Sequence, residues 1–484
     1  MVRAPFRIMS QSLHTTIKDL QKDMYYGNEV LNRVSFLRED TEFISKSLFH
    51  PSTRFIFFNK QNPLVHKNFA NMLTIMTNGD NQICVDQIEP GQQPNNLGYT
   101  GNLQFIPGGL MTHIPHWNEI LHTWNEDNKN MNKELRSDGK PTFLFMGLLD
   151  ESVGLDINSL KVDCELNGDE KYLDHQGRYQ GIAYYAVDVS SNKELCRNLV
   201  HFVNDTINAK QHSGDKSPEE NGVFFTHSRK HFLSFEPKEA SLFSQGAMFF
   251  HWLTTNKFCP GCGHPTIPIH AGGKLYCTND ETITTSSSSN SSSNSDDAAS
   301  FKSVCPVKSA PVSNVSFPRT DMAVISIITN TDRSKILLSL GKRHFSSKMY
   351  SCTAGFMEPS ETVEIATKRE IWEETGVTCD EVNVVMTQPW PFPSNLMIGC
   401  IGVVEFNGTN ELIHLGHDNE LLDARWFDTS FVRKLVYPEQ VSEEADKAFN
   451  PEGIMIPMGQ SIAYNLIKMC VDEEEEQKNK DYKL

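Results

Sequence analysis

The segment GFMEPSETVEIATKREIWEETGV, Gly355 to Val377, decides the fold of the C-terminal part of this chain. Ser360 is suited to cap the start of a helix, because its hydroxyl can accept a hydrogen bond from an unpaired backbone amide. Gly376 is suited to the position just past a helix end, where the backbone often becomes left-handed. The segment therefore predicts a helix from about Glu361 to Thr375.

Three acidic residues crowd one side of this predicted helix. At about 100° per residue, Glu374 lies roughly 40° from Glu370, and Glu373 lies roughly 60° to the other side. Val363 and Ala366 fall on the same side, so this face is expected to pack inward. Like charges at this spacing repel each other, which predicts a neutralising cation. Carboxylate oxygens suit Mg²⁺ or Mn²⁺, which retain waters and bridge to phosphate oxygens. Composition alone also allows an acidic helix that is simply solvated.

The composition of the 484-residue chain is that of a soluble globular protein with two or three domains, because 38% of its residues are hydrophobic. No run of 18 apolar residues is present, so no membrane span or membrane partner is expected. The net charge of −17 argues against a broad nucleic-acid-binding surface. It leaves room for one nucleotide in a cleft where metal ions supply positive charge. The 11 cysteines and the lack of a secretory signal favour a reducing compartment.

Short apolar runs predict strands in both halves of the chain. The N-terminal runs are 54–60, 141–150 and 181–190, and the C-terminal β-rich runs are 322–330 and 335–340. The segments 382–393, 396–406 and 423–427 follow the acidic helix. Helices are predicted near Thr16–Phe36, at Glu239–Leu253 and at Gln460–Val471.

Four cysteines have a spacing that predicts a structural zinc site. Cys259 and Cys262 are separated by two residues in a Pro/Gly turn, and Cys277 follows. Asp280 stands where a regular ribbon would place the fourth cysteine, so Cys305, beyond a Ser/Asn-rich tract, is the candidate. Loop length costs free energy only logarithmically, which makes such a split ribbon tolerable. Four thiolates would saturate zinc and leave it no chemistry. The alternative is a cysteine turn whose remaining thiols are ordinary core residues.

The spacing within the acidic segment resembles the Nudix box. Gly355, five residues, Glu361, seven residues and then the run REIWEETGV, Arg369 to Val377, match every fixed position of that motif. Nudix hydrolases cleave nucleoside diphosphates linked to another moiety.

The resemblance implies a role for each acidic residue. Glu370 and Glu374 would hold the catalytic Mg²⁺ or Mn²⁺, and Glu373 would be a further ligand or a water-activating group. Arg369 would orient the carboxylates rather than react.

The segment QPWPFPSNLM, Gln388 to Met397, further resembles the signature of the NADH pyrophosphatase branch of these enzymes. Three other features occur in the same order as in that branch. They are the zinc ribbon, the sequence FPRTD (317–321) before the first strand of the Nudix domain, and the sequence ARWF (424–427) near the end of that domain. Phe356 would stack on a base, Gln388 and Trp390 would help to build the nucleotide pocket, and Glu420 would also bind metal. The substrate-contacting residues implied by the resemblance are Phe356, Gln388, Trp390, Ser394, Asn395, Glu420 and Ala463. Asn395 departs from the serine that the branch commonly has, and Phe317 and Met322 depart from its usual Tyr and Pro.

The resemblance implies hydrolysis of the pyrophosphate bond of NADH and NAD⁺, which yields nicotinamide mononucleotide and AMP. NAD-capped RNA presents the same bond, but the acidity of the chain ranks free dinucleotide first. Two alternatives stay open. One is a Nudix hydrolase for ADP-ribose or dinucleoside polyphosphates, and the other is a zinc-ribbon nucleic-acid-binding protein with an inactive Nudix domain.

The expected fold class is α+β, with a C-terminal Nudix α/β/α sandwich around a mixed sheet, a small zinc ribbon and an N-terminal α+β domain. The expected boundaries are an extension at 1–50, the N-terminal domain at 51–255, the ribbon at 256–318 with a Ser/Asn-rich insert at about 284–303, the Nudix domain at 319–471 and an acidic tail at 472–484. The family implies a homodimer.

The final tripeptide, Tyr482 to Leu484, differs by one residue from the peroxisomal signal Ser-Lys-Leu. A peroxisomal location is therefore expected, with the cytoplasm as the alternative.

Overall fold

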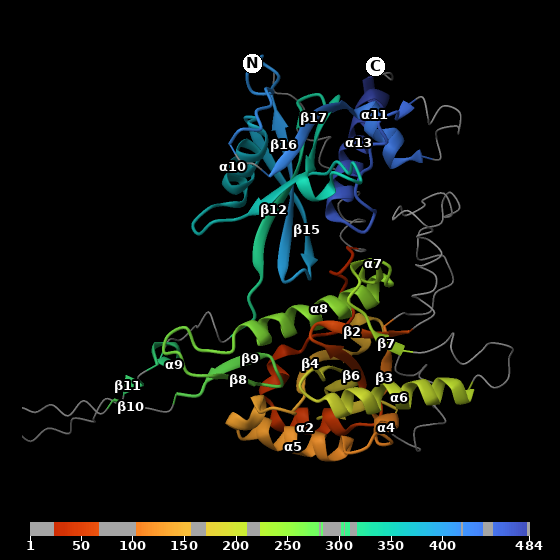
Figure 1. The fold of residues 1–484 in the computed structure, drawn as a ribbon, viewed down its shortest axis with the longest axis vertical. Helices are drawn as coiled ribbons and strands as arrows, with labels where there is room; N and C mark the ends of the chain where they lie inside the picture. The colour runs from red at the N-terminus through yellow and green to blue at the C-terminus, as the bar shows by residue number, and fades with distance from the viewer. Residues whose placement is uncertain are drawn as a thin grey trace, which may run out of the picture. The chain divides into compact units, whose positions relative to one another are not determined.

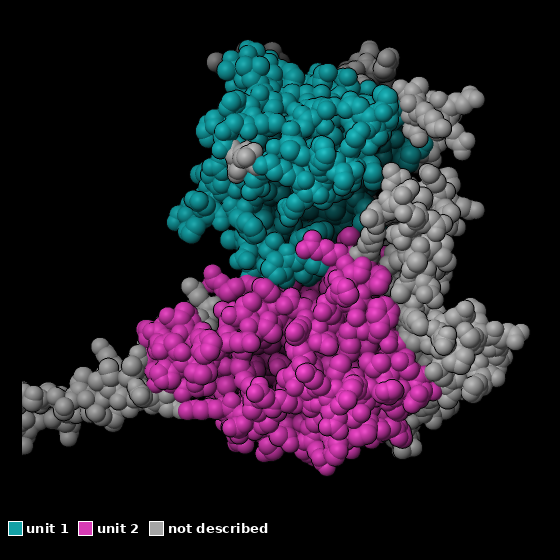
Figure 2. Space-filling model, viewed as in Figure 1, with its two compact units in different colours: residues 1–28, 320–484 teal, residues 29–319 magenta. Residues whose placement is uncertain are grey.

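The computed structural model describes residues 24–66, 103–155, 171–210, 223–279, 282–283, 302–303, 305–309, 317–417, 420–438 and 449–481. The chain forms two compact units (Figure 2). Unit 1 contains residues 1–28 and 320–484, and unit 2 contains residues 29–319.

Unit 2 is built on a sheet in which β1 is parallel to β6 and all other pairs are antiparallel. The order is β4-β6-β1-β2-β7, with β3 on β1 and β5 on β6. The strands are β1 (Arg54–Asn59), β2 (Asn62–His66), β3 (Phe105–Pro107), β4 (Thr142–Leu149), β5 (Leu173–His175), β6 (Tyr179–Asp188) and β7 (Val223–Phe225). The three strands predicted in this half are confirmed.

Helices cover both faces of this sheet (Figure 1). They are η1 (Ser35–Glu39), α2 (Thr41–Phe49), α4 (Gly108–Met111), α5 (Trp117–Lys129), η4 (Lys133–Arg136), η5 (Glu151–Val153), α6 (Lys193–Lys210), α7 (Arg229–Phe232) and α8 (Pro237–Thr255). On one face Gly246 of α8 lies against the Phe58 ring, which a Cβ would approach to 2.6 Å. On the other face Phe43 of α2 meets Phe145 edge-on, with 5.4 Å between ring centroids. Each such buried ring contributes roughly 1.5–3 kcal/mol. The helix predicted at Glu239–Leu253 is confirmed within α8.

The cysteine ribbon is part of unit 2. Strands β8 (Thr266–Ile269) and β9 (Lys274–Cys277) form an antiparallel hairpin, followed by β10 (Thr282–Ile283), β11 (Lys302–Ser303) and α9 (Pro306–Ser309). Ile267 and Ile269 are buried in the same core as the α2 side of the sheet. The Phe145 amide also donates to the Ala271 carbonyl at 2.9 Å. The predicted ribbon segment therefore shares its core with the N-terminal domain.

Unit 1 contains a mixed sheet in which β12 runs parallel to β16 and antiparallel to its other partners. The order is β15-β16-β12-β13-β17, with β14 on β12. The strands are β12 (Asp321–Asn330), β13 (Lys335–Gly341), β14 (Thr353–Phe356), β15 (Glu381–Trp390), β16 (Asn395–Val404) and β17 (Leu421–Asp428). The β-rich runs at 322–330 and 335–340 are confirmed as β12 and β13.

Helices sandwich the unit 1 sheet, as predicted (Figure 1). They are η7 (Lys342–His344), α10 (Val363–Thr375), α11 (Thr429–Val436) and α13 (Ile462–Asp481). Ile371 of α10 packs with Ile328 on one face. Leu466 of α13 packs with the neighbouring Ile327 on the other.

Helix α13 begins at Ile462, two residues after the predicted start at Gln460, and continues to Asp481, through residues assigned to an acidic tail. The extra turns are held because Asp472 accepts a hydrogen bond from the Tyr437 hydroxyl at 2.6 Å. Glu473 pairs with Arg333 at 2.9 Å. The acidic run therefore starts as a packed part of unit 1.

The N-terminal segment also differs from its prediction. Residues 24–34 form no helix, and Tyr26 has a positive φ of 70°. The prediction of a helix at Thr16–Phe36 is therefore wrong for the residues from Met24 onward, and its first part lies outside the described residues. Met24 is buried in the core of unit 1, whereas α2 is buried in unit 2. The segment assigned to an extension thus contributes to both units.

None of the described helices combines the length and the apolar character that a membrane crossing requires.

Candidate active site

Helix α10 carries the acidic segment and starts two residues later than predicted. It begins at Val363, and the Thr362 hydroxyl accepts a hydrogen bond from the Ile365 amide at 3.3 Å. Ser360 has a positive φ of 72° and belongs to the preceding turn, so it is not the capping residue. Gly376 ends the helix as predicted, with a φ of 74°.

Arg369 ties the turn before the helix to the acids on it. Its guanidinium donates two hydrogen bonds to Glu361, at 2.7 and 2.9 Å. This paired, planar geometry is among the strongest ionic contacts in proteins. The guanidinium lowers the pKa of the Glu361 carboxyl to about 2. Glu361 is therefore outside the helix because Arg369 holds it there.

The same guanidinium partly neutralises two of the three crowded acids. Nη1 of Arg369 donates to Oε1 of Glu370 at 2.7 Å and to Oε2 of Glu373 at 2.9 Å. These carboxylates raise the pKa of Arg369, with Glu361 as the largest contributor. No other hydrogen bond is recorded within the described residues for Oε2 of Glu370 or Oε1 of Glu373, which leaves one oxygen of each for a cation.

Gly355 explains how Glu370 reaches its position. A Cβ on Gly355 would lie 2.0 Å from the Glu370 carboxyl carbon, so only a glycine lets β14 and α10 approach this closely. Burial raises the pKa of Glu370, and Arg369 opposes that effect. A partly desolvated carboxylate gains more from a bound cation than an exposed one does.

Glu374 occupies the inward side of α10, with 5% of its surface exposed. Ala366 and Ile371, on the same helix, are also buried. The inward packing predicted for this face is thus observed. The donor set of Glu370, Glu373 and Glu374 is all oxygen, which fits a hard divalent cation. Across the described ranges, however, these carboxylates do not converge closely enough to form a ligand cluster without an ion.

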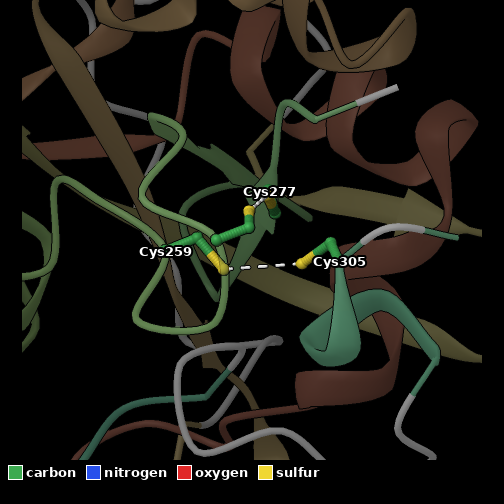
Figure 3. Close-up of side chains that lie close together, drawn as sticks. Cys259, Cys277 and Cys305 are labelled. Atoms are coloured by element: carbon green, nitrogen blue, oxygen red, sulfur yellow. Dashed lines mark hydrogen bonds between the residues drawn. The ribbon is translucent and has the colours of Figure 1, made fainter. Parts of the chain in front are cut away.

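The four cysteines do converge, as the sequence predicted. The sulfur atoms of four cysteines all lie within 4.8 Å of one another: Cys259, Cys262, Cys277 and Cys305. Figure 3 shows Cys305, at the start of α9, pointing toward Cys259, with 3.6 Å between their sulfurs. The Cys262 and Cys277 sulfurs are 3.4 Å apart. Tetrahedral Zn–S bonds of about 2.3 Å would place the sulfurs about 3.8 Å apart, so the cluster fits zinc.

The electrostatics of the cluster also suit a cation. A backbone hydrogen bond at His264 is the largest cause that lowers the pKa of the Cys262 thiol to about 6. Burial raises the pKa of the Cys259 and Cys277 thiols, so these sulfurs would gain most from a positive charge beside them.

Gln388 is fully buried, and backbone groups saturate its amide. Its Nε2 donates to the Tyr25 and Gln460 carbonyls at 3.0 and 2.8 Å. Its Oε1 accepts from the Ile462 amide at 2.8 Å. Gln388 therefore fastens the N-terminal segment to the start of α13, and its role in the nucleotide pocket stays a prediction.

An aromatic cluster surrounds Trp390, which is partly exposed. Its ring meets Tyr26 and Phe392 edge-on, at 5.9 and 5.4 Å between centroids. Sequence reasoning missed Tyr25 and Tyr26. No local signal could have linked them to residues more than 360 positions away, although a tandem aromatic pair was visible.

The remaining predicted substrate residues lie at different depths. Phe356, at the end of β14, is 58% exposed, and Glu420 before β17 is also exposed. Ser394, Asn395 and Ala463 are buried. Strand β12 gathers part of this set, because Asp321 pairs with Asn395 and the nearby Ala323 pairs with Phe356.

Comparisons with known proteins agree with this geometry. The NUDIX domain family matches residues 319–444, and the NADH pyrophosphatase zinc ribbon domain matches residues 254–284. The NAD-capped RNA hydrolase NPY1 of Saccharomyces cerevisiae is 36% identical over 84% of this chain and 85% of its own length. The NAD-capped RNA hydrolase of Schizosaccharomyces pombe is 28% identical over 92% of both chains. The human NAD-capped RNA hydrolase NUDT12 is 27% identical over 92% of this chain and 72% of its own length.

Three findings lead to one assignment: the Nudix box that ends on α10, the four-cysteine ribbon and a relative aligned over most of both chains. The chain belongs to the Nudix hydrolase family, in the branch that carries the NADH pyrophosphatase zinc ribbon.

Proposed function

We propose that this protein hydrolyses the pyrophosphate bond of NADH and NAD⁺, giving nicotinamide mononucleotide and AMP, and that it removes NAD from the 5′ ends of capped RNA. The arrangement of the three acids on α10 carries this proposal: Glu370 and Glu373 are held by Arg369, and Glu374 is buried on the inward side of the helix. The three relatives named above, all called NAD-capped RNA hydrolases, support the choice of substrate.

Glu370, Glu373 and Glu374 would hold Mg²⁺ or Mn²⁺, with Glu420 as a further ligand. When bound, such ions neutralise the pyrophosphate and lower the pKa of an attacking water. Arg369 holds Glu361, Glu370 and Glu373 in fixed positions before substrate arrives. The chain thereby limits the reorganisation that binding a charged substrate would otherwise require.

The exposed ring of Phe356 is available to stack on a base, a contact that contributes about 1–3 kcal/mol. Trp390 is partly exposed and held by Tyr26 and Phe392, so its ring is presented by a rigid aromatic cluster. Gln388 contributes indirectly, because it fixes the main chain on both sides of the start of α13.

The direct test is to incubate the purified protein with Mn²⁺ or Mg²⁺ and a panel of NADH, NAD⁺, ADP-ribose, diadenosine polyphosphates and NAD-capped RNA. The products are then identified by mass spectrometry. AMP plus reduced nicotinamide mononucleotide from NADH is the expected result. Preferred cleavage of ADP-ribose or diadenosine compounds would replace the proposed substrate. RNA binding without cleavage of any compound would overturn the enzymatic function.

The cysteine cluster is proposed to hold one structural Zn²⁺, and the protein is proposed to act as a homodimer. Metal analysis and light scattering test these two points. A peroxisomal location is proposed from the final tripeptide, which lies outside the described residues. Deleting that tripeptide from a fluorescent fusion should release it from peroxisomes, and an unchanged distribution would contradict the proposal.

A further inference from the structure

The loop between β13 and β14 carries an unusual concentration of positive charge. From Arg333 to Met357 the sequence contains no acidic residue, in a chain with a net charge of −17. Arg333 and Lys335 are neutralised by Glu473 and Asp428. The loop itself, Lys342 to Lys348, adds three further cations.

The charge of this loop is directed to solvent. Lys342, Arg343 and Lys348 are all exposed. No ion pair is recorded for Arg343 within the described residues. Nζ of Lys348 donates to the Glu452 backbone carbonyl at 2.7 Å, and no ion pair with an acidic side chain is formed by Lys348 in the described part of the chain. The Glu452 carboxylate is instead paired with Arg425 at 2.8 Å.

An exposed aromatic ring stands among these cations. Phe345 is 68% exposed, the largest exposed fraction among the large hydrophobic side chains in the described part of the chain. Burial and the charge of Arg343 lower the pKa of His344, so this imidazole adds little charge at neutral pH. Cations interleaved with an exposed ring are the chemistry that holds single-stranded nucleic acid, in which phosphates and bases alternate.

The loop is a fixed turn. The Ser347 and Lys348 amides donate to the His344 and Phe345 carbonyls at 3.2 and 3.3 Å. On its far side, the Met455 amide donates to the Lys348 carbonyl at 3.1 Å. The main chain that carries the cations and the ring is therefore held in place, so it does not have to be ordered on binding.

The loop lies beside the predicted active site. The Lys342 amide donates to the Glu420 backbone carbonyl at 3.3 Å, and Glu420 is one of the predicted metal ligands. A polyanion on this loop would lie next to Glu420. This position favours RNA over a lipid surface as the occupant.

We infer that Lys342, Arg343, Phe345 and Lys348 form a docking surface for the first nucleotides of NAD-capped RNA, beyond the NAD moiety. The inference rests on the proposed function and deepens it. The loop would add affinity for capped RNA only, because free NADH has no chain to place there.

The test compares Arg343→Gln and Phe345→Ala with the wild type, using free NADH and a 5′-NAD-capped single-stranded RNA. Lys434→Gln and Phe36→Ala are matched controls, since Lys434 lies on α11 and Phe36, 61% exposed, lies in unit 2. Loss of one stacked base predicts a fall of about tenfold or more in kcat/KM on capped RNA for Phe345→Ala. For Arg343→Gln, the slope of log affinity against log salt should become shallower by about 0.7. Turnover of free NADH should stay within about twofold.

Each other outcome contradicts the inference. Equal losses on NADH and capped RNA would place these residues in the dinucleotide site. Unchanged kinetics on both substrates would show that RNA does not use the loop. Wild-type cleavage of NADH without cleavage of capped RNA would remove the inference and leave a dinucleotide hydrolase. Loss of binding to phosphatidylserine vesicles in the variants, with RNA cleavage unchanged, would make the loop a membrane contact.

Discussion

The cysteine cluster of unit 2 and the acidic cluster of unit 1 are both predicted metal sites, yet the fold treats them differently. The four sulfurs converge within 4.8 Å. Two of the three carboxylates, Glu370 and Glu373, are held by Arg369, and the lack of a Cβ on Gly355 makes room for Glu370. A closed, saturated set of ligands stabilises a fold, whereas an open set restrained by a guanidinium retains positions for substrate and water. The difference teaches that the cysteine ligands are already arranged to enclose one ion, whereas Arg369 holds Glu370 and Glu373 with one oxygen of each left for a cation.

The largest expected effect is on catalysis, from Glu374→Gln. This change keeps the shape of a buried side chain and removes one charge from the proposed metal site. The kcat on NADH should fall by at least about a hundredfold, the size found when one electrostatic stabiliser is lost. Glu364→Gln, on the same helix but exposed, is the control and should stay within about twofold. Near-normal turnover of a folded Glu374→Gln protein would remove Glu374 from the site.

Gly355→Ala tests whether close backbone approach positions the acids. The added methyl would lie 2.0 Å from the Glu370 carboxyl carbon, so that carboxylate must move. A loss of about ten- to a hundredfold in kcat is expected, as for groups that orient metal ligands. The control is Gly341→Ala, where a Cβ meets nothing within 4 Å. Equal activity of the two variants would show that the position of Glu370 is not critical.

Cys305→Ser should change stability more than chemistry. The variant should lose the zinc measured by mass spectrometry, and the melting temperature of the protein should fall by several degrees, at about 2–4 °C per kcal/mol. Turnover per folded molecule should stay within about threefold, because the cysteines lie outside unit 1. Cys196→Ser, which changes a cysteine outside the cluster, should retain zinc. Full zinc content in Cys305→Ser would exclude Cys305 as a ligand.

The smallest expected effect concerns acid stability. Arg369 lowers the folded-state pKa of Glu361 from 4.5 to about 2, so this contact stabilises the fold above pH 4.5 and is lost as the pH falls toward 2. The difference in melting temperature between wild type and Arg369→Gln should therefore shrink over that interval. A difference that stays constant from pH 5 to about 2 would show that the ion pair contributes no stability.

Most of the architecture was predictable, because apolar runs and the fixed spacing of one motif are local signals. These patterns predicted the helix α10 and the strands β1, β4, β6, β12 and β13. They also predicted the convergence of Cys305 with the other three cysteines. The start of α10 did not, because the contact of Glu361 with Arg369 overrides the preference for an early helix start. Two other features depend on contacts between residues distant in sequence, which no local pattern records. Gln388 donates a hydrogen bond to the Tyr25 carbonyl, and the part of α13 past Val471 is held by the ion pair of Glu473 with Arg333.

The most direct test of the central claim is a Mn²⁺ titration of the zinc-loaded protein, followed by electron paramagnetic resonance, for the wild type and Glu374→Gln. If the acids of α10 hold the catalytic cation, the variant should bind Mn²⁺ at least about tenfold more weakly, with its zinc content unchanged. Equal Mn²⁺ affinity in the two proteins would contradict the account.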